Sequence, residues 1–169
     1  MARTATVRGR ANRAEAAEAP AAAGPIRYGP LQDWLGFHLR MAQTASFQAF
    51  AREVEDVDLR PGRFATLMLI GCNPGLSQTA LSRANGRDKS TLTPVLDDLV
   101  RRGLVRRVRT PADRRTYQLT LTLSGERMLQ RLTDCARRHE DRLDLLLGGK
   151  GGKDRQLFLQ ILRRIAAEM

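Results

Sequence analysis

The stretch "LSQTALSRANGRDKSTLTPVLDDLVRRGLVRR", residues 76–107, contains the signals that decide the fold. Ser77 can cap a short helix, and Gly86 follows its end, because glycine readily adopts the left-handed backbone that terminates helices. Asp88 or Ser90 can cap a second helix, in which apolar residues recur every three or four positions until a glycine ends it. Two helices joined by "NGRD" predict a helix-turn-helix.

The second helix is expected to turn a polar face away from its apolar stripe. The outward side chains are expected to be Ser90, Thr91, Pro94, Asp98 and Arg101. A face that is short, polar and hydroxyl-bearing at its N-terminal end suits a helix that enters the major groove of DNA. Asp97 and Asp98 each stand four residues before an arginine and can pair with it. Pro94 lacks an N–H group and disfavours helical backbone at Thr93, so we expect a kink or a late start there.

A β-hairpin is predicted directly after this helix. "LVRRVR" and "TYQLTLT" alternate with period two, which predicts one shared face on each strand: Val105, Arg107 and Arg109 on the first, Tyr117, Leu119 and Leu121 on the second. The tip between them carries Asp113, Arg114 and Arg115. We expect the guanidinium groups to project toward a negatively charged partner. The alternative is a solvated hairpin whose arginines bind nothing.

Positive charge is concentrated around these elements. The formal net charge of the chain is +11, and residues 61–122 carry 11 Lys/Arg against 4 Asp/Glu, whereas residues 28–60 carry 3 against 5. A patch of this kind attracts phosphates, from nucleic acid or from an anionic membrane.

The rest of the chain fits one folded unit with a tail. Residues 1–27 are rich in Ala and Arg and contain no apolar signal-peptide core, so we expect a disordered tail, with a DNA-touching arm as the alternative. Apolar stripes at helical spacing predict long helices within 28–60 and 123–169. The expected fold class is mostly α with a small β-hairpin wing (α+β), in which 61–122 form a winged helix-turn-helix domain.

Cysteine usage and hydropathy indicate a cytoplasmic protein. Cys72 and Cys135 are the only cysteines and form no CxxC motif, which is typical of reduced thiols. The longest apolar stretch, around "FATLMLIG", is far shorter than the roughly 20 residues that span a bilayer.

The order of helices and hairpin, the 76–107 segment, and "DRR" leading into "LTLSG" together resemble the MarR family of winged helix-turn-helix regulators. The resemblance covers about residues 30–168. It implies a transcriptional regulator that binds double-stranded DNA, in which Asp113 fixes the wing and Arg115 enters the minor groove. The expected DNA-binding residues, from the residues and the resemblance together, are Ser77, Gln78, Lys89, Ser90, Thr91, Thr93, Pro94, Arg107, Asp113, Arg114 and Arg115.

The resemblance also implies an obligate homodimer that reads a near-palindromic operator, and we expect this regulator to act as a repressor. The stripes from Leu31 to Phe50 and from Met128 to Leu146 support this, because they are too long for the small winged domain to cover and a second chain would bury them.

A small-molecule effector is the third implication. Members of the family commonly bind aromatic acids, phenols or related anions in a cleft between the dimerisation helices and the winged domain. The candidate ligand-binding residues here are Trp34, Phe37, His38, Arg40, Met41, Arg63, Phe64 and Met68. Either a phenolic acid or an aromatic acyl-CoA thioester suits a set that combines aromatic side chains with arginines, and we expect no further cofactor.

Two other classes of regulator remain open. Cys72, His38 and His139 are compatible with redox or metal sensing, although a histidine on an apolar stripe is more often structural than a metal ligand. A basic dimer is also compatible with an architectural DNA-binding protein. No phosphate loop, paired carboxylates or Ser/His/Asp spacing stands out, so we expect no enzyme.

Overall fold

The computed structural model describes residues 25–54, 61–110 and 113–169, and of residues 61, 110 and 113–116 it describes the backbone alone. The elements are η1 (Gly29–Asp33), α1 (Leu35–Glu53), η3 (Pro61–Arg63), α2 (Phe64–Cys72), β1 (Leu76–Ser77), α3 (Gln78–Ala84), α4 (Lys89–Arg101), β2 (Val105–Thr110), β3 (Asp113–Leu121), α5 (Leu123–Leu146) and α6 (Lys153–Glu168). The fold class is therefore mostly α with a small antiparallel sheet, as predicted.

The chain divides into two compact units between His38 and Leu39. In the first unit, η1 is a short 3-10 helix, and Trp34 is extended, with φ −89° and ψ 118°, so that α1 begins only at Leu35. The apolar stripe expected from Leu31 to Phe50 therefore does not lie on one continuous helix, because it is interrupted at Trp34. In the described part of this unit, η1 is flanked by an aromatic contact, because the ring of Phe37 lies 5.8 Å from that of Tyr28.

The core of the second unit is aliphatic. It joins α2, α3, α4, the sheet and α5, and its fully buried members are Leu67, Ile70, Leu81, Leu92, Leu96, Leu99, Leu119 and Leu132. Burial of each such side chain stabilises the fold by roughly 1.5–3 kcal/mol. The periodic leucines of α4 therefore fix which face of that helix remains outside.

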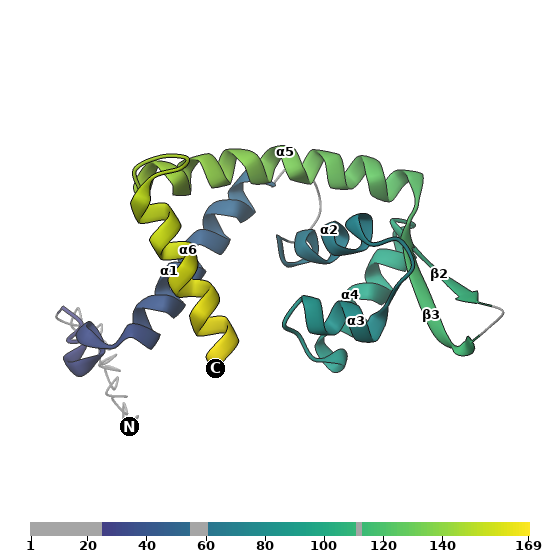
Figure 1. Ribbon diagram of the computed structural model, residues 1–169, viewed down its shortest axis with the longest axis horizontal. Coiled ribbons are helices and arrows are strands. Elements are labelled where there is room, and N and C mark those ends of the chain that lie inside the picture. Colours follow the sequence, from purple (N-terminus) through teal and green to yellow (C-terminus); the bar gives the residue numbers. More distant parts are fainter. Residues whose placement is uncertain (1–24, 55–60, 111–112) are drawn as a thin grey trace, which may run out of the picture. The chain divides into compact units, whose positions relative to one another are not determined.

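The sheet has the order β1-β3-β2. β2 and β3 pair antiparallel, with Val105 opposite Leu121, Arg107 opposite Leu119 and Arg109 opposite Tyr117, so the predicted strand faces are confirmed. Figure 1 shows this hairpin projecting beyond α3 and α4 as a wing. The third strand, β1, was not predicted, because two residues are too short to show a period.

The junction between the sheet and α5 is tight. The side-chain oxygen of Thr122 caps α5 by accepting from the N–H of Gly125 at 3.0 Å, and the backbone N–H of Thr122 donates to the carbonyl of Leu104 at 3.0 Å. A Cβ at Gly125 would lie 2.0 Å from that same carbonyl oxygen. Glycine at this position lets α5 start directly against β2.

No helix among residues 25–54, 61–110 and 113–169 is long and apolar enough to cross a membrane.

Candidate nucleic-acid interface

The turn between α3 and α4 is fixed by the two caps that the sequence predicts. Ser77 Oγ accepts from the N–H of Ala80 at 3.2 Å, and Asp88 Oδ1 accepts from the N–H of Thr91 at 2.7 Å. Gly86, in the turn, has a φ of 61°, which a residue with a Cβ rarely adopts. These local interactions set the direction in which α4 leaves the turn.

The first turn of α4 presents a compact polar surface. Its exposed members are Lys89, Ser90, Thr91, Thr93 and Pro94. Gln78, at the start of α3, reaches this surface and donates its Nε2–H to Thr93 Oγ1 at 2.9 Å. The structure thus brings together six of the predicted DNA-binding residues, whereas the Ser77 hydroxyl is used as a cap.

Pro94 lies inside α4, which begins at Lys89 without delay. Of the two alternatives expected at Pro94, the late start is therefore wrong, and the kink stays a prediction. The Asp88 cap and the burial of Leu92 and Leu96 stabilise the helix on either side of the proline. A proline in the early turns removes one hydrogen bond, and the packing of this amphipathic helix outweighs that loss.

Asp98 does not lie on the outward face, as the sequence had suggested, but is buried. Its carboxylate lies 2.8 Å from Arg63 Nη2 and 3.2 Å from Arg102 Nε, and it also contacts Arg101. Burial favours the protonated form, but the charge of Arg63 and the hydrogen bond from Arg101 outweigh it and lower the pKa of Asp98. The predicted pairing with Arg102 is confirmed, and Arg63 is an additional partner.

Asp97 stays exposed and joins α4 to the wing. Its Oδ1 lies 2.7 Å from Nη2 of Arg107 on β2, rather than pairing with Arg101 as predicted. Asp97 therefore holds one of the predicted DNA-binding arginines against α4, the helix expected to enter the major groove and called the recognition helix below. The prediction that Arg107 contacts DNA is not tested by this arrangement.

The base of the wing is braced by side chains on its strands. The guanidinium of Arg109 lies 5.1 Å from the centre of the Tyr117 ring and donates to its hydroxyl, and Arg106 Nε donates to Thr120 Oγ1 at 3.0 Å. The side chains of Asp113, Arg114 and Arg115 lie outside the described residues, and their proposed roles stay predictions.

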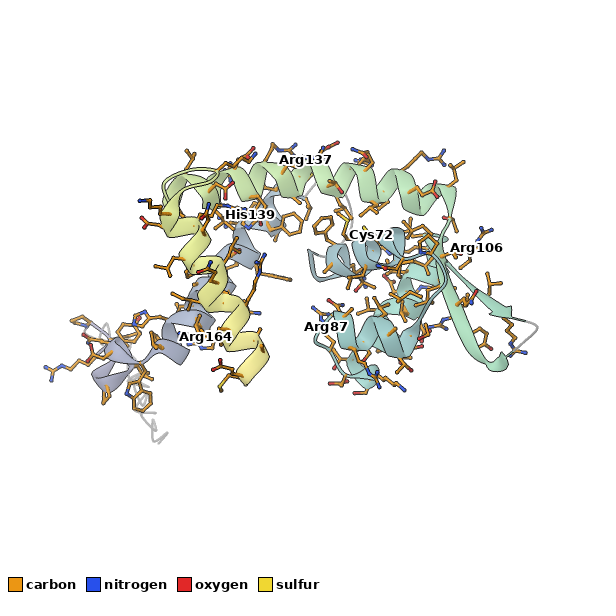
Figure 2. All side chains as sticks on the ribbon, viewed as in Figure 1. Cys72, Arg87, Arg106, Arg137, His139 and Arg164 are labelled. Carbon is orange, nitrogen blue, oxygen red and sulfur yellow. The ribbon has the colours of Figure 1, made fainter. Side chains whose placement is uncertain are left out.

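A cavity of about 230 Å³ lies beside the winged domain, between α1, α2 and α5. It is lined by Gln43, Ser46, Phe47, Phe50, Phe64, Ala136, His139 and Glu140. Figure 2 shows Arg137 and His139 on opposite faces of α5, with His139 on the face turned toward α1 and α2.

His139 gives this mostly apolar cavity a polar group. The side chain is 8% exposed, its Nε2 shares a hydrogen bond of 3.0 Å with Ser46 Oγ, and its ring lies 5.6 Å from that of Phe50. Its Nδ1 is buried and has no hydrogen-bond partner among the described residues. A buried nitrogen without a partner costs about 1–3 kcal/mol, which is the kind of cost that a ligand can relieve.

The predicted ligand-binding residues are distributed over several places. Phe64 lines the cavity, Arg63 is paired with Asp98, and Met68 lines a different cavity next to Cys72. Trp34, Phe37 and His38 belong to the first unit, where His38 donates to the carbonyl of Gln32, and Arg40 and Met41 are exposed on the second. The roles of these side chains remain predictions.

Sequence reasoning missed Ser46, Phe47 and Phe50 as cavity residues and assigned His139 only as a sensor or core residue. The sequence did contain one signal for this cavity wall: Ser46 and Phe50 lie four positions apart and therefore share one face of a helix. No cluster of three or more His, Cys, Asp or Glu side chains able to hold a metal occurs in the part of the chain that the structure describes.

Comparison with known proteins gives one consistent result. The MarR family model matches residues 59–117. A protein of Thauera aromatica described as a transcriptional regulatory protein for the hcr operon is 34% identical over 139 residues, which cover 82% of each chain.

Solved structures agree with this match over nearly their whole length. The transcriptional repressor CouR bound to a 23-mer DNA duplex is 38% identical with a TM-score of 0.75, over 84% of this chain and 99% of that one. CouR bound to p-coumaroyl-CoA is 36% identical with a TM-score of 0.76, over 86% of this chain and 100% of that one. PcaV of Streptomyces coelicolor in complex with its natural ligand is 30% identical with a TM-score of 0.72, over 82% and 95%.

Proposed function

The chain belongs to the MarR family of DNA-binding transcriptional regulators, and we propose that it is a homodimeric repressor released from a near-palindromic operator by an anionic aromatic ligand. The observation that carries the DNA half of this proposal is the exposed polar first turn of α4 beside a basic wing. That arrangement matches what a major groove and a flanking minor groove require. In this proposal the chain carries no catalytic activity and no cofactor.

Apolar side chains near the C-terminus support the dimer. Leu145 and Leu146 of α5 are 77% and 81% exposed, and Leu157 and Phe158 of α6 are 57% and 41% exposed. Burial of such a surface against a second copy removes it from water, and a two-fold dimer places two winged domains on one DNA duplex.

The cavity beside His139 supports the ligand. Its aromatic walls suit an aromatic ring, and the Ser46–His139 pair offers a polar contact to a substituent on that ring. CouR has been solved with p-coumaroyl-CoA, the CoA thioester of a phenolic acid, which makes an aromatic acyl-CoA and the free phenolic acid the two ligand classes to test.

One peptide bond and one ion pair link the cavity to α4. Phe64 lines the cavity, and the preceding residue, Arg63, is the partner of Asp98 on α4. A ligand that displaces Phe64 therefore acts on a residue next to the one that positions α4. Because such coupling is reciprocal, operator DNA must weaken ligand binding by the factor by which ligand weakens DNA binding.

The test combines thermal denaturation with DNA binding. A panel of phenolic acids and their CoA esters is screened for a raised melting temperature, since a ligand of the folded state stabilises it. A hit should release a palindrome from the protein's own promoter, and the release should be weaker in a His139→Ala variant. Arg137→Ala, on the opposite face of α5, is the matched control. Ligands that stabilise the protein but leave DNA affinity unchanged contradict the proposed switch.

The exposed thiol of Cys72 supports a second candidate function, a thiol-sensing regulator. Cys72 is exposed, whereas Cys135 is buried, so a thiol-sensing regulator would act through Cys72. Iodoacetamide labelling of the native protein, followed by DNA binding, separates the two candidates, because only a thiol sensor loses its operator on modification. An architectural role is separated by comparing the promoter palindrome with scrambled DNA, which an architectural protein binds equally well.

A further inference from the structure

We propose that Asp88 fixes the hydroxyl groups of Ser90 and Thr91 as hydrogen-bond acceptors, so that the first turn of α4 reads the amino groups of bases rather than phosphates. This inference rests on the proposed entry of α4 into the major groove. It adds to that entry a residue that determines specificity without touching DNA.

The contacts of Asp88 assign the hydroxyl protons. Ser90 Oγ lies 2.6 Å from Oδ1 of Asp88, and Thr91 Oγ1 lies 3.1 Å from Oδ2. An ionised carboxylate can only accept hydrogen bonds, and a hydroxyl has a single proton to donate. Both hydroxyl protons therefore point at Asp88, and the oxygen lone pairs remain for another partner.

Asp88 is ionised at neutral pH. The hydrogen bond from the Ser90 hydroxyl and the one from the Thr91 N–H lower the pKa of Asp88 from 3.8 to about 2. The carboxylate is thus fully ionised in the pH range in which DNA binding is measured.

The hydroxyl proton of Thr93 is also already used, but by a backbone carbonyl rather than by Asp88. Thr93 Oγ1 lies 2.7 Å from the carbonyl oxygen of Lys89, which can only accept, so Thr93 donates its proton there. The group of Gln78 that lies 2.9 Å from Thr93 Oγ1 must then be the amide nitrogen. The amide of Gln78 is oriented by this contact, and three hydroxyls of the surface have no proton left to donate.

Acceptors and donors meet different parts of DNA. Phosphate oxygens, guanine N7 and O6 and thymine O4 are all acceptors, so a hydroxyl with a committed proton gains nothing from them. The donors of the major groove are adenine N6 and cytosine N4. Ser90 and Thr91 therefore favour an adenine or a cytosine at the positions they face, and the charge of Asp88 repels nearby phosphates.

The experiment begins with selection of binding sites from a random duplex pool by the full-length protein. In the selected site, each adenine is replaced in turn by purine and each cytosine by 2-pyrimidinone, which removes the amino group alone. We expect this removal to weaken wild-type binding by roughly 3- to 10-fold at the positions facing α4, as loss of one hydrogen bond does. Ser90→Ala and Thr91→Val should each become insensitive to removal at one of those positions, which is the signature of a direct contact.

Asp88→Asn tests the positioning role. Asparagine caps a helix as well as aspartate, but its amide donates a proton to one of the two hydroxyls, which then becomes free to donate to DNA. The selected base at that position should shift from adenine or cytosine toward guanine or thymine. Asp134→Asn removes the same charge at an exposed residue of α5 that pairs with Arg137, away from the proposed interface, and should leave the base preference unchanged.

The outcomes separate this inference from the proposed function. Failure of the wild type to select any site overturns the proposed function, and the inference with it. A selected site that tolerates removal of every amino group, or an Asp88→Asn variant with wild-type preferences and wild-type helix content, overturns the inference alone. Ser90→Ala and Thr91→Val variants that weaken binding equally at every sequence also overturn it, because a uniform loss is the mark of a lost phosphate contact.

Discussion

Arg63, directly before α2, and Asp98, in the last turn of α4, form an ion pair of 2.8 Å between side chains that are 16% and 12% exposed. The pair ties the recognition helix to the segment that also supplies a wall of the cavity. Arg101 and Arg102 add their charges to the same carboxylate.

Asp98→Ala should destabilise the protein by on the order of 3 kcal/mol, because it leaves the largely buried guanidinium of Arg63 without its partner. Asp97→Ala is the matched control: Asp97 is 52% exposed, and the loss of its pair with Arg107 should cost less than about 1 kcal/mol. Urea unfolding followed by circular dichroism measures both. Equal losses would show that burial does not distinguish the two pairs.

Gly125→Ala should destabilise the protein by about 2–4 kcal/mol, because the added Cβ would meet the backbone oxygen of Leu104 at 2.0 Å and α5 or β2 would have to shift. Gly36→Ala, in α1, meets nothing within 4 Å and should stabilise by about 0.5–1 kcal/mol. The free energies of unfolding of the two variants should thus change in opposite directions. A tolerated alanine at 125 would contradict the close approach of α5 to the sheet.

Arg115→Ala should weaken operator binding by about 1–3 kcal/mol if this arginine enters the minor groove. Asp113→Ala should weaken binding too, although it makes the protein more positive, because Asp113 is predicted to orient the wing. Operator affinity against salt concentration, with circular dichroism as a folding control, checks both. Tighter binding by Asp113→Ala would show that the wing tip acts only as a cluster of charge.

The contribution of Asp88 to the stability of the folded protein should fall with pH between 3.8 and about 2. Because the pKa of Asp88 is lowered from 3.8 to about 2 in the folded state, its contribution to stability is fully present above pH 3.8 and is lost as the pH falls to about 2. The difference in melting temperature between wild type and Asp88→Asn should therefore shrink across this range. A difference that stays constant down to pH 2 would contradict the assigned hydrogen bonds.

The sequence by itself determined the winged helix-turn-helix, because its signals are local. Ser77 and Asp88 cap α3 and α4, and Gly86 supplies the left-handed turn, each through atoms within three residues. The alternation in the hairpin likewise fixed which residues of β2 and β3 share a face, since a strand has a period of two. The polar surface of α4 followed from the same helical periodicity.

Only the tertiary structure decided which polar groups are buried and which partners they meet. Asp98 looked outward in the sequence, but Arg63, 35 positions earlier, lies against it, and no periodicity reports a contact over that separation. Ser46 and His139, 93 positions apart, share a hydrogen bond for the same reason. The two residues of β1 form a strand because they pair with the edge of β3. The interruption at Trp34 is visible only in the backbone angles of the folded chain. Helix and strand signals are short-range properties of the chain, whereas burial, ion pairs and cavities depend on segments that meet only after packing.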